Sequence, residues 1–409
     1  MESPFTDAPH SPLAETRTIR KPWPMRLIVL STFLSLTLAA CASDSSSSGG
    51  SGGTAGSAGS GGEAGNGGSA GGGGTGDFVA MLKHTFDPQM IDVAEETSSV
   101  CQSWVLDNDE PLYVRKIRQS NDGGWHHSNW FFVPDTAYLP NPEAEGPDAT
   151  QEGTWDCRDR QFREYLAAAA GGVFFAQSTQ ALTERQDFPN GAALVIPPHS
   201  VIIGSTHLLN ISGAPLSTSM SFEVELAEPE DVDVLLSPFS FAIGDLNIPP
   251  AIDGVPTESR TSMMCDLREQ FKIVKDEDVV DYKIYYVLGH YHEWGNYFNL
   301  SFQNEDGSLT KIFEIKNSIG EPIGSIIDPP MSNNGANKLR SECGFLNNTD
   351  ETISRGLQYG EMCDFLAYHD ANIKLGATGV NNVDMGVDEM GRRIFETECG
   401  SLTGFPGNE

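Results

Sequence analysis

Two of the nine histidines in this 409-residue chain lie two residues apart, in the stretch Gly-His-Tyr-His-Glu-Trp-Gly at 289–295. The stretch ends an apolar run that is typical of a buried strand. On an extended strand, residues i and i+2 point to the same face, so His290 and His292 are expected to project together. Two neighbouring imidazoles can chelate one metal ion. The alternative is two unrelated surface histidines, and further ligands elsewhere in the chain must decide between these interpretations.

Three more histidines occur in two other strand-like stretches. His126 and His127 are adjacent in Gly-Gly-Trp-His-His-Ser-Asn-Trp, and His207 lies in Gly-Ser-Thr-His-Leu-Leu-Asn. Adjacent residues on a straight strand face opposite ways. Both can reach one ion only if the backbone kinks or if one of them uses a different ring nitrogen, and Gly123 and Gly124 just before them would permit a kink. A His-His dipeptide by itself is more often incidental than a site.

A thioether follows late in the chain, in the run Glu-Met-Cys at 361–363. Met362 alone would be interpreted as a core methionine that fills a gap. Only together with the histidine motifs does Met362 become a candidate ligand.

The elements that position these residues are predicted to be short strands. Several stretches are rich in β-branched or aromatic residues and are bounded by Gly, Pro, Asn and Asp, which is the pattern of β-sandwiches. These stretches are 129–134, 192–198, 200–211, 221–227, 279–292, 297–303, 310–316 and 361–369, and the one helix candidate is 159–171. About 330 residues follow position 77, and one small hydrophobic core normally serves fewer residues than that. We therefore expect two domains, with a boundary near the acidic, Pro-containing stretch at 227–238.

The N-terminus is predicted to be a targeting segment. A basic region is followed by the apolar run Leu-Ile-Val-Leu-Ser-Thr-Phe-Leu-Ser-Leu-Thr-Leu-Ala-Ala, which is too short and wrongly flanked for a spanning helix. The Leu-Ala-Ala-Cys that ends at Cys41 resembles a bacterial lipobox. The resemblance implies a signal peptide over 1–41, lipidation of Cys41, and anchoring in the cell envelope. The alternative is an ordinary signal peptide with an incidental cysteine.

The residue after Cys41 is Ala rather than Asp, which in such lipoproteins points to the outer membrane. Whether the folded domains would lie on the periplasmic or on the outer surface of that membrane is left open. Residues 42–77 are almost all Gly, Ser and Ala, a composition that behaves as a flexible tether.

Net charge and cysteine content exclude further classes of ligand and of metal site. The net charge of −32 argues against nucleic acid, whose phosphates require a basic face. Six cysteines follow Cys41, and an even number in an exported protein predicts disulfides. No Cys-x-x-Cys motif is present, which argues against a thiolate zinc site. Composition alone does not choose among the fifteen connectivities that six cysteines allow.

Taken in order, the motifs His-His, His, His-x-His and Glu-Met-Cys resemble the copper type II, ascorbate-dependent monooxygenases. This family includes peptidylglycine α-hydroxylating monooxygenase and dopamine β-hydroxylase. The resemblance implies an all-β fold of two tandem jelly-roll β-sandwich domains, which we place at 78–230 and 231–409. Each domain would carry one of two copper ions, and the ions would face each other across a solvent-filled cleft.

The resemblance also implies roles for the candidate ligands. An electron-transfer copper would be held by His126, His127 and His207. An oxygen-activating copper would be held by His290, His292 and Met362, which would be the catalytic residues. The positions of the cysteines resemble those of family disulfides and imply the pairs Cys101–Cys157, Cys265–Cys399 and Cys343–Cys363. Two further disulfides of the family are absent.

The implied reaction is hydroxylation of a C–H bond of a small organic substrate, with O₂ and ascorbate or another one-electron reductant. The substrate positions depart from the peptide-amidating members. Leu288 stands where those members have Arg, Ser205 where they have Gln, Leu366 where they have Tyr, and Asp364 where they have Asn. Without the Arg, a carboxylate-ended peptide loses its charge-assisted anchor, so peptide amidation is not predicted. Asp364 would either favour a cationic or hydroxylated substrate or be a solvated surface acid.

Two other functions remain open. One is a non-catalytic lipoprotein that binds and buffers copper at the cell envelope. The other is an adhesion module with vestigial sites, against which the full set of six ligands argues. The remaining histidines His84, His199 and His369 are interpreted as structural or surface residues, and Trp125 and Trp130 as core packing.

Overall fold

A computed structural model describes residues 78–134, 152–157, 171–178, 180–316, 324–356 and 360–407. The expected signal segment with Cys41, the expected tether at 42–77 and nearly all of the helix expected at 159–171 lie outside these residues. No helix among the described residues has the length and apolar character that a membrane crossing requires.

Most of the described residues lie in β-strands, so the prediction of an all-β fold is confirmed. We call residues 78–226 the N-terminal half and residues 234–407 the C-terminal half. The N-terminal half contains β1 (Leu82–Thr85), β2 (Gln89–Ile91), β3 (Glu96–Val105), β4 (Leu112–Asn121), β5 (Trp125–Val133), β6 (Gly153–Asp156), β7 (Gly172–Gln177), β8 (Thr183–Asp187), β9 (Ala192–Ile196), β10 (Val201–Leu209), β11 (Leu216–Thr218) and β12 (Met220–Leu226). The short helix η3 (Pro229–Asp231) follows, at the expected domain boundary.

The C-terminal half has the same strand-rich character and one described α-helix. Its elements are β13 (Val234–Ile243), β14 (Asn247–Ile248), β15 (Thr257–Asp266), α3 (Arg268–Lys275), β16 (Lys283–His290), β17 (Gly295–Gln303), β18 (Leu309–Lys316), β19 (Ser325–Ser332), β20 (Lys338–Asn347), β21 (Ile353–Ser354), β22 (Asp364–His369), β23 (Ile373–Val387) and β24 (Arg393–Pro406).

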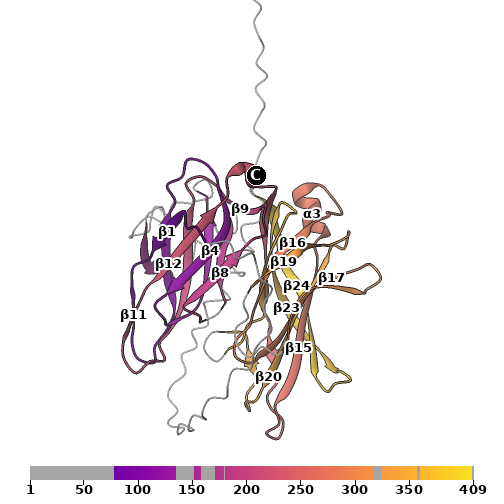
Figure 1. Cartoon of the computed structure of the whole chain (residues 1–409). Helices are drawn as coiled ribbons and strands as arrows, with labels where there is room; N and C mark the ends of the chain where they lie inside the picture. The colour runs from indigo at the N-terminus through magenta and orange to yellow at the C-terminus, as the bar shows by residue number, and fades with distance from the viewer. Residues whose placement is uncertain are drawn as a thin grey trace, which may run out of the picture. The chain divides into compact units, whose positions relative to one another are not determined.

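Two layers of strands form the N-terminal half (Figure 1). One layer is the five-stranded sheet β6-β3-β10-β5-β7, and the other is the run β1-β12-β4-β9, with β8 paired to β4. Large aromatic side chains fill the space between them: Trp130 and Phe222 meet edge to face with ring centroids 5.1 Å apart, and both are fully buried. Alternation of apolar and polar residues along β4 and β12 places one face of that layer in this core.

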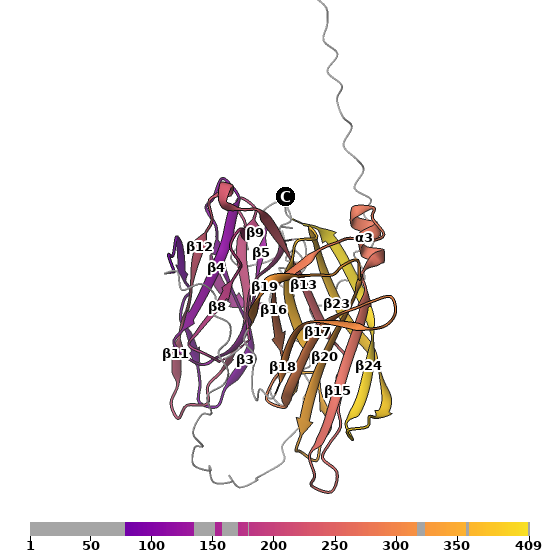
Figure 2. The ribbon, with the colours of Figure 1, turned by 45° about the vertical axis from the view of Figure 1, so that its right-hand side comes forward.

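The C-terminal half continues the second of these layers. β13 pairs in parallel with β9 through Val234–Leu236, and from β13 the sheet runs on through β23, β24, β15, β20, β17 and β18. On its other side β13 pairs with β22, which leads to β16 and β19 (Figure 2). Apolar residues from both groups of strands, among them Phe239, Phe298 and Phe365, form one core.

The two halves also share apolar packing, and this fixes how the histidine motifs meet. Tyr286 and Leu288 of β16 belong to the same buried cluster as the aromatic core of the N-terminal half. The Tyr368 hydroxyl of β22 donates to the Val173 carbonyl oxygen at 3.0 Å, and the Gln186 side-chain amide donates to Tyr368 at 3.3 Å. The sequence of β16 is an almost unbroken apolar run because both of its faces are covered.

The helix α3 was not foreseen from the sequence. Its backbone begins with the Arg268 N–H donating to the Asp266 carboxylate at 3.2 Å, and it ends at Asp276, whose φ of 59° is left-handed. One apolar side chain, Phe271, is fully buried on the core. Eight residues with one buried anchor give too weak a periodic signal to distinguish from the strands around them.

Three disulfides join the strands, in the pairs that the family resemblance implies. Cys101 bonds to Cys157, Cys265 to Cys399, and Cys343 to Cys363. The prediction of disulfide bonds is therefore confirmed. The third pair fixes the residue that directly follows Met362 to the central strand β20.

One glycine tests the packing of the N-terminal layers. Gly204 of β10 lies opposite Trp130 of β5, and a Cβ at that position would overlap the indole ring. Gly204→Ala is therefore expected to lower the free energy of unfolding by about 1–3 kcal/mol, as overpacking does, measured by urea denaturation. The control is Gly213→Ala, where an added Cβ meets nothing within 4 Å. Equal stabilities of the two variants would contradict this account of the core.

Candidate metal centre

His126 and His127 reach the same region because β5 contains a bulge at this point. Trp125 pairs with Leu208 of β10, and His127 pairs with His207, so His126 is an extra residue between two ladder positions. A bulge bends the strand and redirects side chains that would otherwise alternate. The expected kink is present, although it arises from the bulge itself. Gly123 and Gly124, with φ of 98° and 74°, form the turn that leads into the strand.

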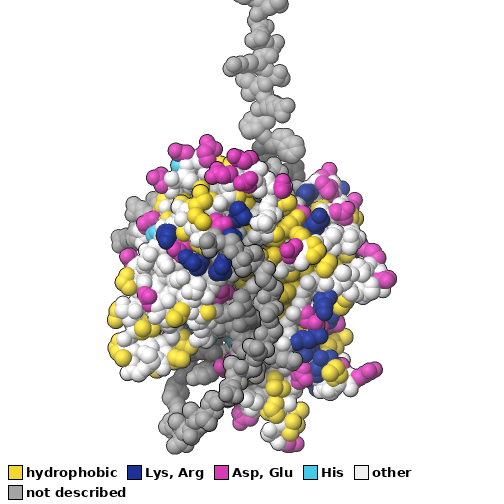
Figure 3. Space-filling model, in the orientation of Figure 1, with side chains coloured by type: hydrophobic (Ala, Val, Ile, Leu, Met, Phe, Trp, Pro, Cys, Tyr) yellow, Lys and Arg dark blue, Asp and Glu magenta, His cyan; other side chains and the backbone are white. Residues whose placement is uncertain are grey.

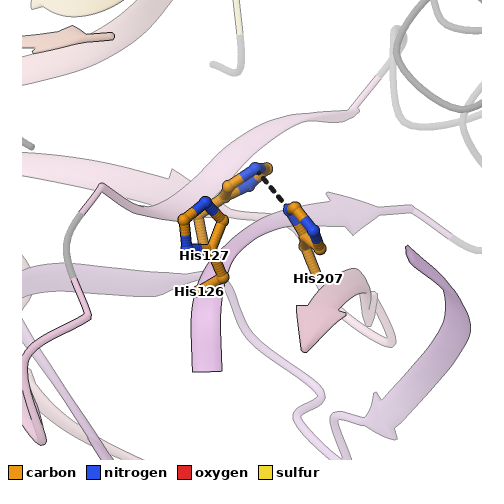
Figure 4. Close-up of side chains that lie close together, drawn as sticks. All are labelled: His126, His127 and His207. Atoms are coloured by element: carbon orange, nitrogen blue, oxygen red, sulfur yellow. Dashed lines mark hydrogen bonds between the residues drawn. The ribbon is translucent and has the colours of Figure 1, made fainter. Parts of the chain in front are cut away.

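His207 contacts His127 directly across the two strands (Figure 4). The distance between His207 Nδ1 and His127 Nε2 is 2.9 Å. On its other side, His207 Nε2 lies within hydrogen-bonding distance of a Glu96 carboxylate oxygen, at the start of β3. A carboxylate only accepts hydrogen bonds, so this contact is made by the tautomer of His207 that carries its proton on Nε2 and turns the Nδ1 lone pair toward His127. Metal-ligating histidines commonly have such a carboxylate partner.

His290 and His292 are not both on a strand, which corrects the expectation from their spacing. β16 ends at His290, and His292 lies in the following turn. The ring centroids are nevertheless 5.2 Å apart. His292 Nδ1 donates to the Gly360 carbonyl oxygen at 3.0 Å, and His290 Nδ1 lies 3.2 Å from the Ser178 hydroxyl oxygen.

Glu361 explains why the chain leaves the strand after His290. Its buried carboxylate accepts hydrogen bonds from the backbone N–H groups of His292, of Trp294 at 3.1 Å and of Met362 at 2.7 Å. These N–H groups are thereby satisfied without a strand partner. Burial raises the pKa of the Glu361 carboxyl to about 8, an effect that the three N–H donors oppose.

Met362 lies in the segment that Glu361 ties to the His-x-His turn. Its side chain is 4 % exposed, and its neighbour Cys363 is fixed by the disulfide to Cys343. Gly360, two residues before it, accepts the hydrogen bond from His292. The Met362 segment and the His-x-His turn therefore lie side by side, and the connecting role of Glu361 was not predicted from the sequence.

All five histidines of the three motifs converge on one cluster. The ring centroids of His127 and His290 are 5.1 Å apart, and those of His126 and His292 are 5.6 Å apart. Two groups have ligand atoms within 4.8 Å of one another: His126, His127 and His207, and also His127, His290 and His292. The structure therefore differs from the expected solvent-filled cleft between two separate sites, because the packing of β16 and β22 on the N-terminal half brings the motifs into contact.

Burial favours the neutral form of four of these imidazoles, those of His126, His127, His290 and His292. Burial lowers the pKa of His126 to about 4. Burial is also the main reason why the pKa values of His127, His290 and His292 are lowered. The neighbouring imidazoles add to this effect, because each disfavours a positive charge on the next. Neutral imidazole is the form that binds metal ions.

The outward ring nitrogens of the His-x-His pair take part in no hydrogen bond within the described part of the protein. Nε2 of His290 and Nε2 of His292 are buried and have no hydrogen-bond partner among the described residues. A buried polar atom without a partner is costly. Because the His292 proton is on Nδ1, its Nε2 lone pair is available to coordinate a metal ion.

Two of the positions that differ from the peptide-amidating enzymes lie in the apolar core that the two halves share. Leu288 and Leu366 are paired across β16 and β22, and both are buried. Asp364 is paired with the Arg355 guanidinium by two hydrogen bonds of 2.6 and 2.8 Å, so its charge is compensated within the protein. Asp364 is therefore neither a free anchor for a cationic substrate nor a solvated surface acid, the two roles considered for it. Ser205 is partly buried on β10.

The other histidines lie outside the cluster, as expected. His84 stacks on Trp104 with ring centroids 5.0 Å apart, His199 is exposed near Asp109, and His369 is buried against Phe239. Trp125 and Trp130 are buried in the N-terminal core, which confirms their interpretation as packing residues.

Glu96 is the second residue that the sequence did not reveal. Nothing in the sequence distinguishes it from the other acidic side chains, which are spread over the surface of both halves (Figure 3). Its role depends on the register of β3 against β10, where a second irregularity falls between Thr206 and Leu208. This irregularity places Glu96 beside His207.

Comparisons with known proteins identify no relative by sequence: no family model matches the chain, and no curated protein matches it. Solved structures match at low identity. The PBSX exported protein XepA is 7% identical, with 70% of this chain and 86% of that chain covered and a TM-score of 0.20. PNGase F, a glycosylasparaginase from Flavobacterium meningosepticum, is 9% identical, with 71% and 96% covered and a TM-score of 0.29. The VP2 subviral particle of infectious bursal disease virus is 9% identical, with 72% of each chain covered and a TM-score of 0.16. At these TM-scores none of the three structures informs the function of the histidine cluster.

Proposed function

We propose that the protein is a copper-dependent monooxygenase that hydroxylates a C–H bond of a small organic substrate. The observation that carries the proposal is the convergence of five histidines from three distant segments, next to the segment that holds Met362. Three imidazoles suit copper in both oxidation states, and two imidazoles with a thioether suit Cu(I). This donor set is the one that the family resemblance implies for two copper ions.

The unpartnered nitrogens support metal binding independently of the resemblance. His290 and His292 each present a buried Nε2 atom with no partner among the described residues, and each has its Nδ1 held by a protein oxygen. Such outer partners fix the ring orientation and the tautomer of metal-ligating histidines. Glu96 does the same for His207.

Copper, when bound, would supply the redox chemistry with O₂. The balanced reaction converts R–H, O₂, two electrons and two protons to R–OH and water, and ascorbate or another one-electron reductant supplies the electrons. The protein's own residues hold the ligands in place and shape the substrate environment. Leu288 and Leu366 offer no charge or hydroxyl group where the peptide-amidating members have Arg and Tyr, and Arg355 pairs with Asp364. These features favour a neutral substrate and disfavour a carboxylate-ended peptide.

The finer expectations belong to this proposal. They are a jelly-roll topology in each half, a lipid anchor on Cys41, and a place at the outer membrane. The three disulfides support export, because disulfides form and persist in oxidising compartments.

The test uses copper-loaded full-length protein, ascorbate and ¹⁸O₂. The probes are neutral arylalkyl compounds, with a glycine-extended peptide as the carboxylate-ended control. We expect ¹⁸O in one or more hydroxylated neutral products, faster ascorbate consumption when that compound is present, and no label in the peptide. The copper-buffering alternative would be supported if copper binds, no product is labelled, and the rate of ascorbate oxidation is the same with and without each probe compound.

A further inference from the structure

The second histidine group contains ligands from both halves of the chain. His127 lies on β5 of the N-terminal half, while His290 and His292 belong to the C-terminal half. Their ligand atoms lie within 4.8 Å of one another. The family resemblance assigns these three residues to two different sites, so their grouping is a property of this fold.

The two C-terminal members of this group are held in orientations that leave one ring nitrogen of each available to an ion. Their Nε2 atoms are buried and unpartnered among the described residues. The Ser178 hydroxyl group and the Gly360 carbonyl group hold their Nδ1 atoms, so the Nε2 atoms cannot turn away without breaking these contacts. Ser178 is itself part of the N-terminal half, which ties His290 to that half even without a metal ion.

We propose that His127, His290 and His292 form an all-imidazole site for a divalent ion of the Zn²⁺ type, which binds between the two halves and joins them. Three histidines with a fourth, open position are a common zinc arrangement. Zinc has no need of the thioether, so Met362 takes no part. The site stands whether or not the protein is a monooxygenase, because it uses neither O₂ nor a reductant.

The shared residue sets the stoichiometry. His127 also belongs to the group with His126 and His207. When His127 binds an ion together with His290 and His292, only two imidazoles remain for the other group. Zinc is therefore expected to bind tightly at one ion per chain, whereas the proposed copper enzyme holds two ions.

Calorimetric titration of the metal-free full-length protein with Zn²⁺ tests the site. His290→Ala and His292→Ala should each weaken zinc binding by more than the roughly 10–100-fold that loss of an outer-shell partner costs. His126→Ala, the matched control from the same cluster, should change the affinity only a few-fold, and Met362→Ile should do the same. The reverse pattern, with binding lost in His126→Ala and kept in His290→Ala, would overturn the proposal.

A second measurement decides the matter even if the His290 and His292 variants fail to fold. X-ray absorption at the zinc edge of the His126→Ala protein should show three imidazole ligands and no sulfur. Two imidazoles, or a sulfur shell, would place the ion in one of the other groups and refute the site. Success or failure here is independent of the ¹⁸O₂ experiment, since zinc is not a redox ion.

Discussion

Met362→Ile is expected to abolish coupled oxygenation and to leave a folded protein that still binds copper through His126, His127 and His207. Isoleucine keeps the apolar volume at this buried position but has no ligand atom. The C-terminal site should therefore lose its soft donor and hold Cu(I) less tightly. The volume-conserving swap itself should cost about 1.5 kcal/mol or less in unfolding free energy.

The measurements are X-ray absorption of the reduced protein and product formation in the ¹⁸O₂ assay. The sulfur shell should be present in the unaltered protein and absent in the variant. Met263→Ile is the matched control, because Met263 is equally buried in the C-terminal core but lies in β15. A variant at Met362 that kept both its sulfur shell and its activity would remove Met362 from the ligand set.

Glu361→Ala is expected to cause the largest loss of stability among single substitutions near the centre. Three backbone N–H groups, of His292, Trp294 and Met362, would lose their acceptor. Each buried donor left without a partner costs about 1–3 kcal/mol. Since these donors hold the His-x-His turn against the Met362 segment, Cu(I) affinity should fall as well, by about 10–100-fold.

Glu361→Gln separates the two effects. An amide oxygen in place of Oε1 still accepts from His292 and Met362, while the amide nitrogen faces the N–H of Trp294. The loss in unfolding free energy should then be about 1–3 kcal/mol, as for one unmatched donor. Urea denaturation measures the free energy of unfolding, and competition with a Cu(I) chelator measures the Cu(I) affinity. The control is Glu396→Gln, because Glu396 is an exposed side chain on β24. If Glu361→Ala is as stable as that control, the carboxylate does not hold the turn.

The amino-acid sequence is informative where chemistry is carried by residue type and order. Histidine and methionine are scarce, so their order along the chain indicates candidate ligands directly. Strand content is equally accessible, because β-branched runs with Gly and Pro at their ends have a local signature. The disulfide pairs followed from the family resemblance, and the structure contains the same three.

Other features depend on register and packing and have no local signature. The bulge at His126 exists only relative to β10, and Glu96 reaches His207 only through the alignment of β3. Glu361 is one of 57 acidic residues, and only its burial sets it apart. The meeting of the two histidine groups results from apolar side chains such as Tyr368 between the halves, which a pattern along one strand cannot reveal.

The position of the last strand has a consequence for the order of events in folding. β24 does not lie at an edge: it pairs with β23 on one side and, in parallel, with β15 on the other. The Cys265–Cys399 disulfide closes a separation of 134 residues across the same sheet. Contacts between residues so far apart in sequence are slow to form. The C-terminal sheet is therefore incomplete until β24 has been synthesised, well after β5, β10 and β16, which carry His127, His207 and His290.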